Sequence, residues 1–154
     1  MKTTAIIFGA DHAGYKLKQF LARELEKSGN YVIDLGNEKF NKSDDYPIFA
    51  HAVATAVSKT KNVFGILLCG NAVGMCMTAN KVKGVRAGIG YSEYASRTMR
   101  TDDDANVLCI PARALTNKKA LSVTNTFLNT KFSNAARHKR RLKQVKKLES
   151  ITMK

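Results

Sequence analysis

Short apolar runs alternate with amphipathic stretches along the whole chain. Five mostly apolar runs of four or five residues predict buried strands at residues 4–8, 31–35, 64–68, 85–89 and 107–110. Between the strands, apolar residues recur at helical spacing, which predicts helices at 15–27, 47–57, 75–81, 92–100 and 117–128. A final basic helix is expected within residues 134–148.

This alternation of strand and helix predicts an α/β fold. We expect a doubly wound five-stranded parallel sheet, a Rossmann-like three-layer sandwich with helices on both faces, followed by the basic C-terminal helix. The length of 154 residues suits one domain spanning 1–154, and no linker or repeat divides it. Ligands of such sheets bind beyond the carboxyl ends of the strands. The loops at Asp11-His12, 69–74 and 91–93 are therefore the places to expect a site.

An uncharged stretch at 62–80 is almost long enough to span a membrane. Glycines and an asparagine interrupt it, so a buried strand, a loop and the start of a helix explain it better, and no membrane association is expected. No secretory signal is visible. The three cysteines are odd in number and match neither a disulfide framework nor a zinc motif, which favours a reducing, cytoplasmic location.

The formal net charge is +14, and basic residues gather in the last quarter of the chain. Such a cluster attracts phosphate esters or nucleic acid, although a solvated helix face is the ordinary explanation. The tail has few aromatic residues and no recognised nucleic-acid motif, so nucleic acid is not an expected partner. Arg137 and Arg141 lie four residues apart, on one face of the expected helix, where two guanidinium groups can hold one phosphate.

Two loops carry candidate chemistry. Asp11-His12 can bind hydroxyls or phosphate, although Asp11 can equally cap a helix. The loop Cys69-Gly70-Asn71-Ala72-Val73-Gly74 lies between a buried strand and a helix. Backbone N–H groups at a helix start can stabilise an oxyanion and favour a thiolate. Cys69 can then act as a base next to a carbonyl or as a nucleophile, or it is simply a buried strand-end cysteine.

Together the motifs resemble ribose-5-phosphate isomerase type B, a family that also includes galactose-6-phosphate isomerase subunits. The resemblance covers residues 5–148 in the family's order and spacing. It rests on Asp11-His12-Ala13-Gly14, Asp45-Tyr46-Pro47, Cys69-Gly70, Ala79-Asn80-Lys81, Gly84-Val85-Arg86-Ala87, Asn106-Val107-Leu108 and Arg137-His138.

The resemblance implies an aldose–ketose isomerase that works through a cis-enediolate without metal or cofactor. It also implies a homodimer, in some members a tetramer, whose sites are shared between subunits. By position, Cys69 would move the proton between C1 and C2, and the loop from Gly70 to Gly74, with Asn71 and Ala72, would hold the enediolate oxygen. Asp11 and Tyr46 would contact the sugar. Phosphate would be bound by His12, Arg113, Arg137 and Arg141.

Two departures from the family pattern stand out. The family loop usually reads Cys-Gly-Thr-Gly-x-Gly, whereas Asn71 and Ala72 stand here at the threonine and the second glycine. Asn71 can still donate a hydrogen bond, but Ala72 adds a methyl group where the backbone needs positive φ or close approach. Ring-opening members carry His-Asn where this chain has Asp102-Asp103.

Three explanations of Asp102-Asp103 remain. Asp102 acts as ring-opening base with another group as acid and Asp103 contacts the sugar, or the substrate opens unaided, or activity is lost and binding remains. The expected function is the interconversion of ribose 5-phosphate and ribulose 5-phosphate. The alternatives are a galactose-6-phosphate or allose-6-phosphate isomerase and a non-catalytic sugar-phosphate-binding subunit.

Overall fold

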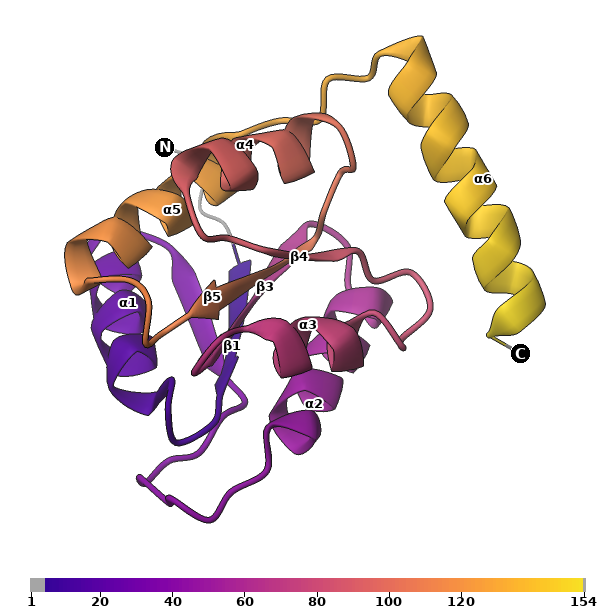
Figure 1. Ribbon diagram of the computed structural model, residues 1–154. Helices are drawn as coiled ribbons and strands as arrows, with labels where there is room; N and C mark the ends of the chain where they lie inside the picture. Colours follow the sequence, from indigo (N-terminus) through magenta and orange to yellow (C-terminus); the bar gives the residue numbers. More distant parts are fainter. Residues whose placement is uncertain (1–4, 154) are drawn as a thin grey trace.

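The computed structural model describes residues 5–153 and contains five strands and six helices in that range (Figure 1). The strands are β1 (Ala5–Ala10), β2 (Tyr31–Asp34), β3 (Val63–Cys69), β4 (Ala87–Ile89) and β5 (Val107–Pro111). The helices are α1 (Tyr15–Lys27), α2 (Tyr46–Lys59), α3 (Val73–Ala79), α4 (Glu93–Thr101), α5 (Asn117–Asn129) and α6 (Ala136–Thr152). Every expected element is present, and Thr4 of the first expected strand lies outside the described residues.

The expected parallel sheet is confirmed. Its strands are ordered β2-β1-β3-β5-β4, and every neighbouring pair is parallel. Cys69, the last residue of β3, pairs with Pro111, the last residue of β5. The carboxyl ends of β3 and of its neighbour β5 are therefore level with each other.

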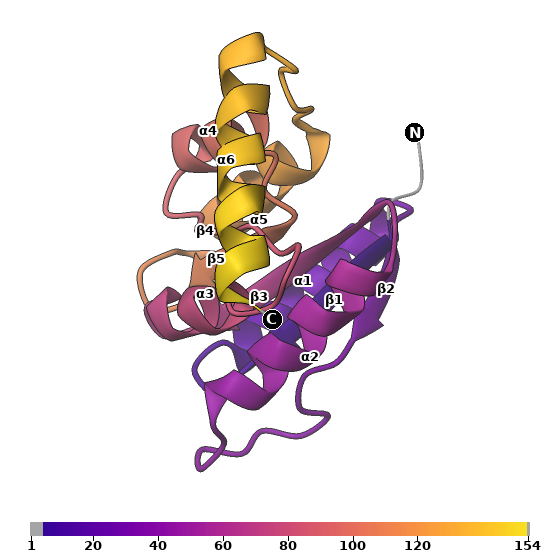
Figure 2. The same ribbon diagram turned by 90° about the vertical axis from the view of Figure 1, so that its right-hand side faces the viewer.

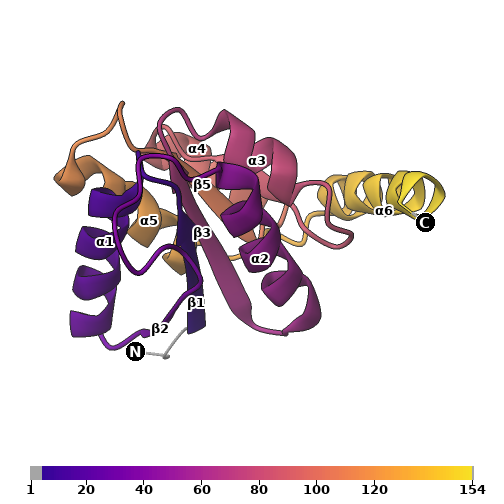
Figure 3. The same cartoon turned by 90° about the horizontal axis from the view of Figure 1, so that it is seen from below.

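Helices cover both faces of the sheet, as Figure 3 shows from below, and an apolar cluster lies on each face. Phe8, Leu21 and Phe127 belong to the buried cluster on the α1, α4 and α5 side, whereas Val53 and Met75 belong to the cluster on the α2 and α3 side. The alternating direction of side chains along β1 and β3 supplies both clusters. This is the three-layer arrangement that the pattern predicts.

Several element boundaries differ from the sequence-based prediction. α3 begins at Val73, two residues earlier than expected, and ends at Ala79. β4 begins at Ala87 rather than at residue 85. The Asn80 side chain accepts from the backbone N–H of Ala87 at 2.9 Å and donates to its carbonyl at 3.0 Å. This side chain thereby ties the end of α3 to the start of β4.

Helix α6 stands beside the three layers rather than within them (Figures 1 and 2). His138 in its first turn is buried, but Val145, Leu148 and Ile151 are 52%, 62% and 58% exposed. Near its far end, the Glu149 carboxylate accepts from the backbone N–H of Gly84 at 2.6 Å. An apolar stripe on an arm that its own chain leaves uncovered is typical of a contact surface for another chain.

Candidate active site

A cavity of about 620 Å³ opens where β1, β3 and β5 end. It lies at the edge of the sheet where such folds bind ligands. Eight of the predicted site residues line it: Asp11, His12, Tyr46, Cys69, Gly70, Asn71, Gly74 and Arg113. Tyr91, from the loop 91–93 where a site was expected, also lines it, as do Ile89 and Pro111, which the sequence did not single out.

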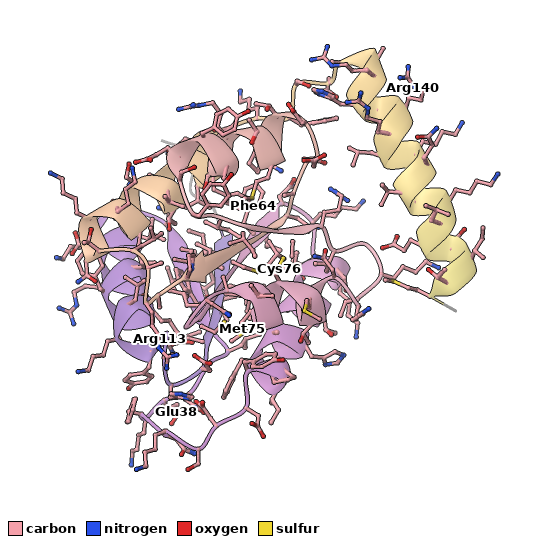
Figure 4. All side chains as sticks on the ribbon, in the orientation of Figure 1. Glu38, Phe64, Met75, Cys76, Arg113 and Arg140 are labelled. Carbon is pink, nitrogen blue, oxygen red and sulfur yellow. The ribbon has the colours of Figure 1, made fainter. Side chains whose placement is uncertain are left out.

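Cys69 lies at the inner wall of this cavity. Its residue is only 4% exposed, so the thiol is sheltered from bulk water although it borders the cavity. The neighbouring loop fixes it, because the N–H of Ala112 donates to the Cys69 carbonyl at 2.9 Å and the N–H of Arg113 donates to the Gly70 carbonyl at 3.1 Å. The loop after β5 is thereby held against the loop after β3, with the Arg113 side chain beside the cavity (Figure 4).

Cys69 is the one of the three free thiols that borders the cavity. Burial raises the pKa of Cys109 well above its ordinary value, so this residue stays a neutral thiol. A hydrogen bond from Cys109 lowers the pKa of Cys76, against an opposing effect of burial. Cys76 and Cys109 form a separate pair between α3 and the sheet, away from the cavity lining.

The loop after Cys69 holds a strained residue. Ala72 has φ 66° and ψ −15°, the left-handed conformation that favours glycine, as its replacement of the family glycine suggested. The whole residue is buried in the apolar layer on the α2 and α3 side, and it does not line the cavity. The Asn71 side-chain oxygen accepts from the N–H of Val73 at 3.1 Å, which leaves its NH₂ group as the donor for a ligand.

Two glycines allow close approaches within the site. A Cβ on Gly74 would lie 2.5 Å from the Tyr46 ring, and a Cβ on Gly70 would lie 3.0 Å from the Arg113 guanidinium. Both larger side chains therefore lie directly over the loop. The spacing of the sequence motifs could not predict these contacts, because Tyr46 and Arg113 come from distant segments.

Asp11 acts on the backbone before α1. One of its carboxylate oxygens accepts from the N–H groups of Ala13 and Gly14, at 2.9 and 3.1 Å. The capping-type role weighed from the sequence is thus present, at the turn rather than at the helix cap itself, which is Gly14. The same residue lines the cavity, so Asp11 combines a structural role with a position at the cavity wall.

His12 has a partner that the sequence did not reveal. The Asp44 carboxylate lies 2.7 Å from His12 Nδ1 and accepts from the His12 backbone N–H at 2.9 Å. Asp44 lies in the loop between β2 and α2, 32 residues away along the chain. A carboxylate on one imidazole nitrogen fixes the orientation of the ring and leaves the other nitrogen for the cavity.

Five predicted site residues do not line the cavity of their own chain. Ala72 is buried beside the lining residue Asn71, and the other four are Asp102, Asp103, Arg137 and Arg141. α4 runs back along the sheet, so Asp102 at its end and Asp103 lie near the amino end of β5. The two arginines are on α6, and Figure 4 shows Arg140, between them, on the opposite side of the molecule from Arg113. Within a single chain, the two aspartates and the two arginines therefore lie away from Cys69 and its cavity.

Asp102 has a histidine neighbour. His138 Nδ1 lies 3.8 Å from the Asp102 carboxylate and 2.8 Å from the Ser133 hydroxyl. The Asp102 carboxylate also accepts from the Thr101 hydroxyl at 2.7 Å, and its side chain is 46% exposed. His138 entered the sequence analysis only as part of a family motif, and its approach to Asp102 depends on how the segment before α6 folds back.

Asp104 anchors the segment that carries Asp102 and Asp103. Its carboxylate accepts from Arg86 at 3.0 Å and from Arg100 at 2.8 Å. The Arg100 guanidinium is 4.8 Å from the Phe64 ring centre, so the ion pair is packed against the core. Asp104 itself has φ 46°, a conformation that aspartate adopts more readily than most residues. The acidic turn is therefore rigidly placed.

Within residues 5–153, no group of three or more histidine, cysteine or acidic side chains is arranged to hold a metal ion. In the same part of the chain, none of the helices has the length and apolar character needed to cross a bilayer.

Comparison with known proteins gives the same architecture and a family. The crystal structure of ribose-5-phosphate isomerase B from Mycoplasma genitalium with bound ribulose-5-phosphate superposes with a TM-score of 0.93 at 38% identity, over 99% of this chain and 100% of that one. The structure of ribose-5-phosphate isomerase B from Clostridium thermocellum superposes with a TM-score of 0.92 at 37% identity, over 96% of this chain and 99% of that one. The curated Mycoplasma genitalium sequence, a probable ribose-5-phosphate isomerase B, is 40% identical over 148 residues, 96% of this chain and 97% of its own length.

The α/β fold has a cavity at its strand ends, and the isomerase relatives at 36–40% identity over most of the chain define the protein as an enzyme of the isomerase class. The family model described as Ribose/Galactose Isomerase matches residues 6–145, and the chain belongs to this family. The resemblance noted from the sequence motifs is thus confirmed.

Proposed function

We propose that the protein interconverts ribose 5-phosphate and ribulose 5-phosphate, a reaction of the pentose phosphate pathway. The observation that carries the proposal is the cavity, which joins Cys69, Asp11, His12 and Arg113 at the ends of the central strands. Relatives with 36–40% identity over most of the chain are named ribose-5-phosphate isomerase B or probable ribose-5-phosphate isomerase B. The three free thiols fit a reducing, cytoplasmic location.

In the proposed reaction the Cys69 thiolate removes the proton from C2 of the open aldose. The electron pair forms a C1–C2 double bond, and the carbonyl oxygen gains the negative charge of a cis-enediolate. Asn71 NH₂ and the backbone N–H groups of the loop from Gly70 to Gly74 stabilise this oxygen. Cys69 then returns the proton to C1, while a proton moves from the C2 hydroxyl to the C1 oxygen. No net change in protons or electrons results.

The remaining roles follow position. Asp11 and Tyr46 contact the sugar hydroxyls, and His12 and Arg113 bind the phosphate from within the same chain. Arg137, Arg141 and the Asp102-Asp103 pair are contributed by a second copy, since their own chain holds them away from the cavity. Asp102, with His138 beside it, opens the sugar ring. The exposed apolar stripe of α6 supplies the surface for this homodimer.

Replacement of the proposed base tests the mechanism. Cys69→Ala is expected to lower kcat for ribose 5-phosphate by at least about 100-fold, the usual contribution of a positioned base. Formation of ribulose 5-phosphate by the pure protein is the measurement. The matched control is Cys76→Ala, which removes a half-buried thiol outside the cavity and should keep most of the activity. An unchanged rate in the Cys69 variant would exclude this mechanism.

A non-catalytic sugar-phosphate-binding subunit is the second candidate, and two observations favour it: the strain at Ala72 and the carboxylate of Asp102 at the family's histidine position. It predicts a rise in melting temperature with ribose 5-phosphate but no turnover of pentose or hexose phosphates. Turnover of galactose 6-phosphate or allose 6-phosphate instead of ribose 5-phosphate would assign the other activity of the family.

A further inference from the structure

The pairing of His12 with Asp44 is a built feature of the cavity wall. Asp44 makes two contacts with one residue, at 2.7 Å to the imidazole Nδ1 and 2.9 Å from the backbone N–H. Its side chain is 5% exposed, whereas that of His12 is 32% exposed. The carboxylate therefore lies behind the ring, and the ring lies between the carboxylate and the open cavity.

The second carboxylate oxygen of Asp44 is also held. It accepts from the side-chain NH₂ of Asn37. The carbonyl of Asn37 in turn accepts from the ammonium of Lys18 at 3.1 Å, and Lys18 is fully buried and paired with Asp34. A series of bonds thus runs from α1 through the loop before α2 to the ring of His12. Because both oxygens have partners, the carboxylate has one fixed position.

We propose that Asp44 is a positioning residue for phosphate binding: it turns His12 Nε2 toward the cavity and stabilises the ring with a proton on both nitrogens when the phosphate enters. With Nδ1 facing a carboxylate, Nε2 is the nitrogen left for a ligand. An imidazolium donates from both nitrogens, and a charge-assisted hydrogen bond to phosphate is roughly twice as strong as a neutral one. This inference rests on the proposed function, because it assumes that the cavity binds a phosphate ester.

The pair of His12 and Asp44 also bears on the positive charge that a phosphate requires in the cavity. Arg113 is the arginine of the described chain that lines it, and the carboxylate of Asp11 opposes a phosphate there. With His12 in the proposed doubly protonated form, the same chain would supply a second cation that offsets Asp11. The negative charge of Asp44 is shielded by its burial and by Asn37, so it acts on the ring more than on the ligand.

The loop does not depend on Asp44 alone for its position. The Tyr15 hydroxyl donates to the Glu38 carbonyl at 2.9 Å, and the N–H of Gly36 donates to Asp34 at 2.8 Å. Neutralising Asp44 therefore removes a charge behind His12 and leaves the loop attached. Asp44→Asn is the suitable change, because it keeps the size and one acceptor oxygen. Glu38→Gln, an exposed neighbour on the same loop, is the control for loss of one negative charge.

The test measures KM and kcat for ribose 5-phosphate and, by calorimetry, the binding of inorganic phosphate. Asp44→Asn is expected to weaken phosphate binding and raise KM by about tenfold, with kcat within about twofold, as for a lost charge-assisted hydrogen bond. Glu38→Gln should leave all three values unchanged. The nitrogen chemical shifts of the His12 ring in the phosphate complex should show protons on both nitrogens in the unmodified protein.

A double-mutant cycle separates positioning from a structural role. In a His12→Gln background, Asp44→Asn should have no further effect, because it acts through the ring. Equal effects of Asp44→Asn with and without His12 would overturn the inference, as would unchanged phosphate binding in the single variant. Absence of phosphate binding by the unmodified protein would overturn it as well. If the unmodified protein binds phosphate with the expected dependence on Asp44 but fails to turn over ribose 5-phosphate, the proposed function fails and the inference stands.

Discussion

The loop after β3 contains one alanine, Ala72, whose methyl group makes its backbone conformation unfavourable. Ala72 occupies the left-handed region with its side chain fully buried among the residues of the α2 and α3 layer. This conformation costs an alanine about 1–2 kcal/mol. The surrounding bonds retain it, including the one from the N–H of Cys76 to the Ala72 carbonyl at 3.0 Å. Strain of this kind is concentrated at functional sites.

Substitutions at Ala72 should show how relief of its backbone strain compares with loss of its buried methyl group. Ala72→Gly relieves the strain but loses a buried methyl worth about 0.8 kcal/mol and adds about 0.5–1 kcal/mol of backbone entropy to the unfolded chain. The free energy of unfolding should therefore change by less than about 1 kcal/mol. Ala72→Val should lower it by about 2–3 kcal/mol, because a branched side chain is poorly tolerated at positive φ and overpacks the layer. Urea unfolding measures both, and a valine variant as stable as the glycine variant would contradict the assigned strain.

At the scale of elements, the start of α4 is tied to α5 by one carboxylate. Glu93 accepts from the Lys119 ammonium at 2.6 Å and from the Ser122 hydroxyl at 2.7 Å. The bond from Lys119, which has the larger effect, and the bond from Ser122 lower the pKa of Glu93 from its ordinary 4.5 to about 2. Since the folded pKa lies below the unfolded one, the contribution to stability is complete above about pH 4.5 and is lost as the pH falls toward 2.

Acid unfolding should show this link. Over the range from about pH 4.5 to 2, the melting temperature of the protein should fall more steeply than that of Glu93→Gln, which has no carboxylate to protonate. Glu26→Gln, an exposed change on α1, is the control and should follow the unmodified protein. Melting curves of the three proteins at matched ionic strength are the measurement. Parallel curves for the protein and Glu93→Gln would rule the link out.

The elements themselves were largely predictable from local pattern. The amphipathic spacing of 15–27 gives the exact bounds of α1, and Gly29, at φ 84°, follows its C-terminal cap Ser28. The start of β4 was wrong by two residues. Its boundary is set by the Asn80 side chain and by the bond from Arg86 N–H to the Asn106 side chain at 2.8 Å. Such long-range bonds leave no periodicity in the sequence.

The candidate site was predictable where one short segment supplies it. The loop 69–74 and Asp11-His12 are contiguous and follow strands, so topology alone brings them together. Asp44 and His138 could not be found in this way. Each depends on the path of an irregular segment, the loop before α2 or the turn before α6, and neither path follows a repeating pattern of side chains.

At the scale of the whole molecule, the expected site residues fall into two groups at opposite edges of one chain. Cys69 and Arg113 lie at the carboxyl ends of the strands, whereas Asp102 follows α4 near the amino end of β5. Helix α6 with its arginines lies across the molecule from Arg113, as Arg140 shows in Figure 4. If a second copy supplies the missing group, two variants that are each inactive should restore one another. Cys69→Ala impairs one group, and Arg137→Ala together with Arg141→Ala impairs the other.

Mixing these two variants, after mild unfolding and refolding together, should recover about a quarter of the unmodified rate, because half of the random dimers carry one intact site of two. Either variant, unfolded and refolded alone, should recover no activity. No recovery, with sedimentation showing that mixed dimers have formed, would mean that each chain builds its site alone.

The separate arm of α6 has a kinetic consequence. When the far edge of one copy closes the near edge of another across a two-fold axis, the same encounter closes the reciprocal pair as well. Each dimer that forms would then complete two active sites at once. The turnover per chain would decline when the protein is diluted below the dissociation constant of the dimer.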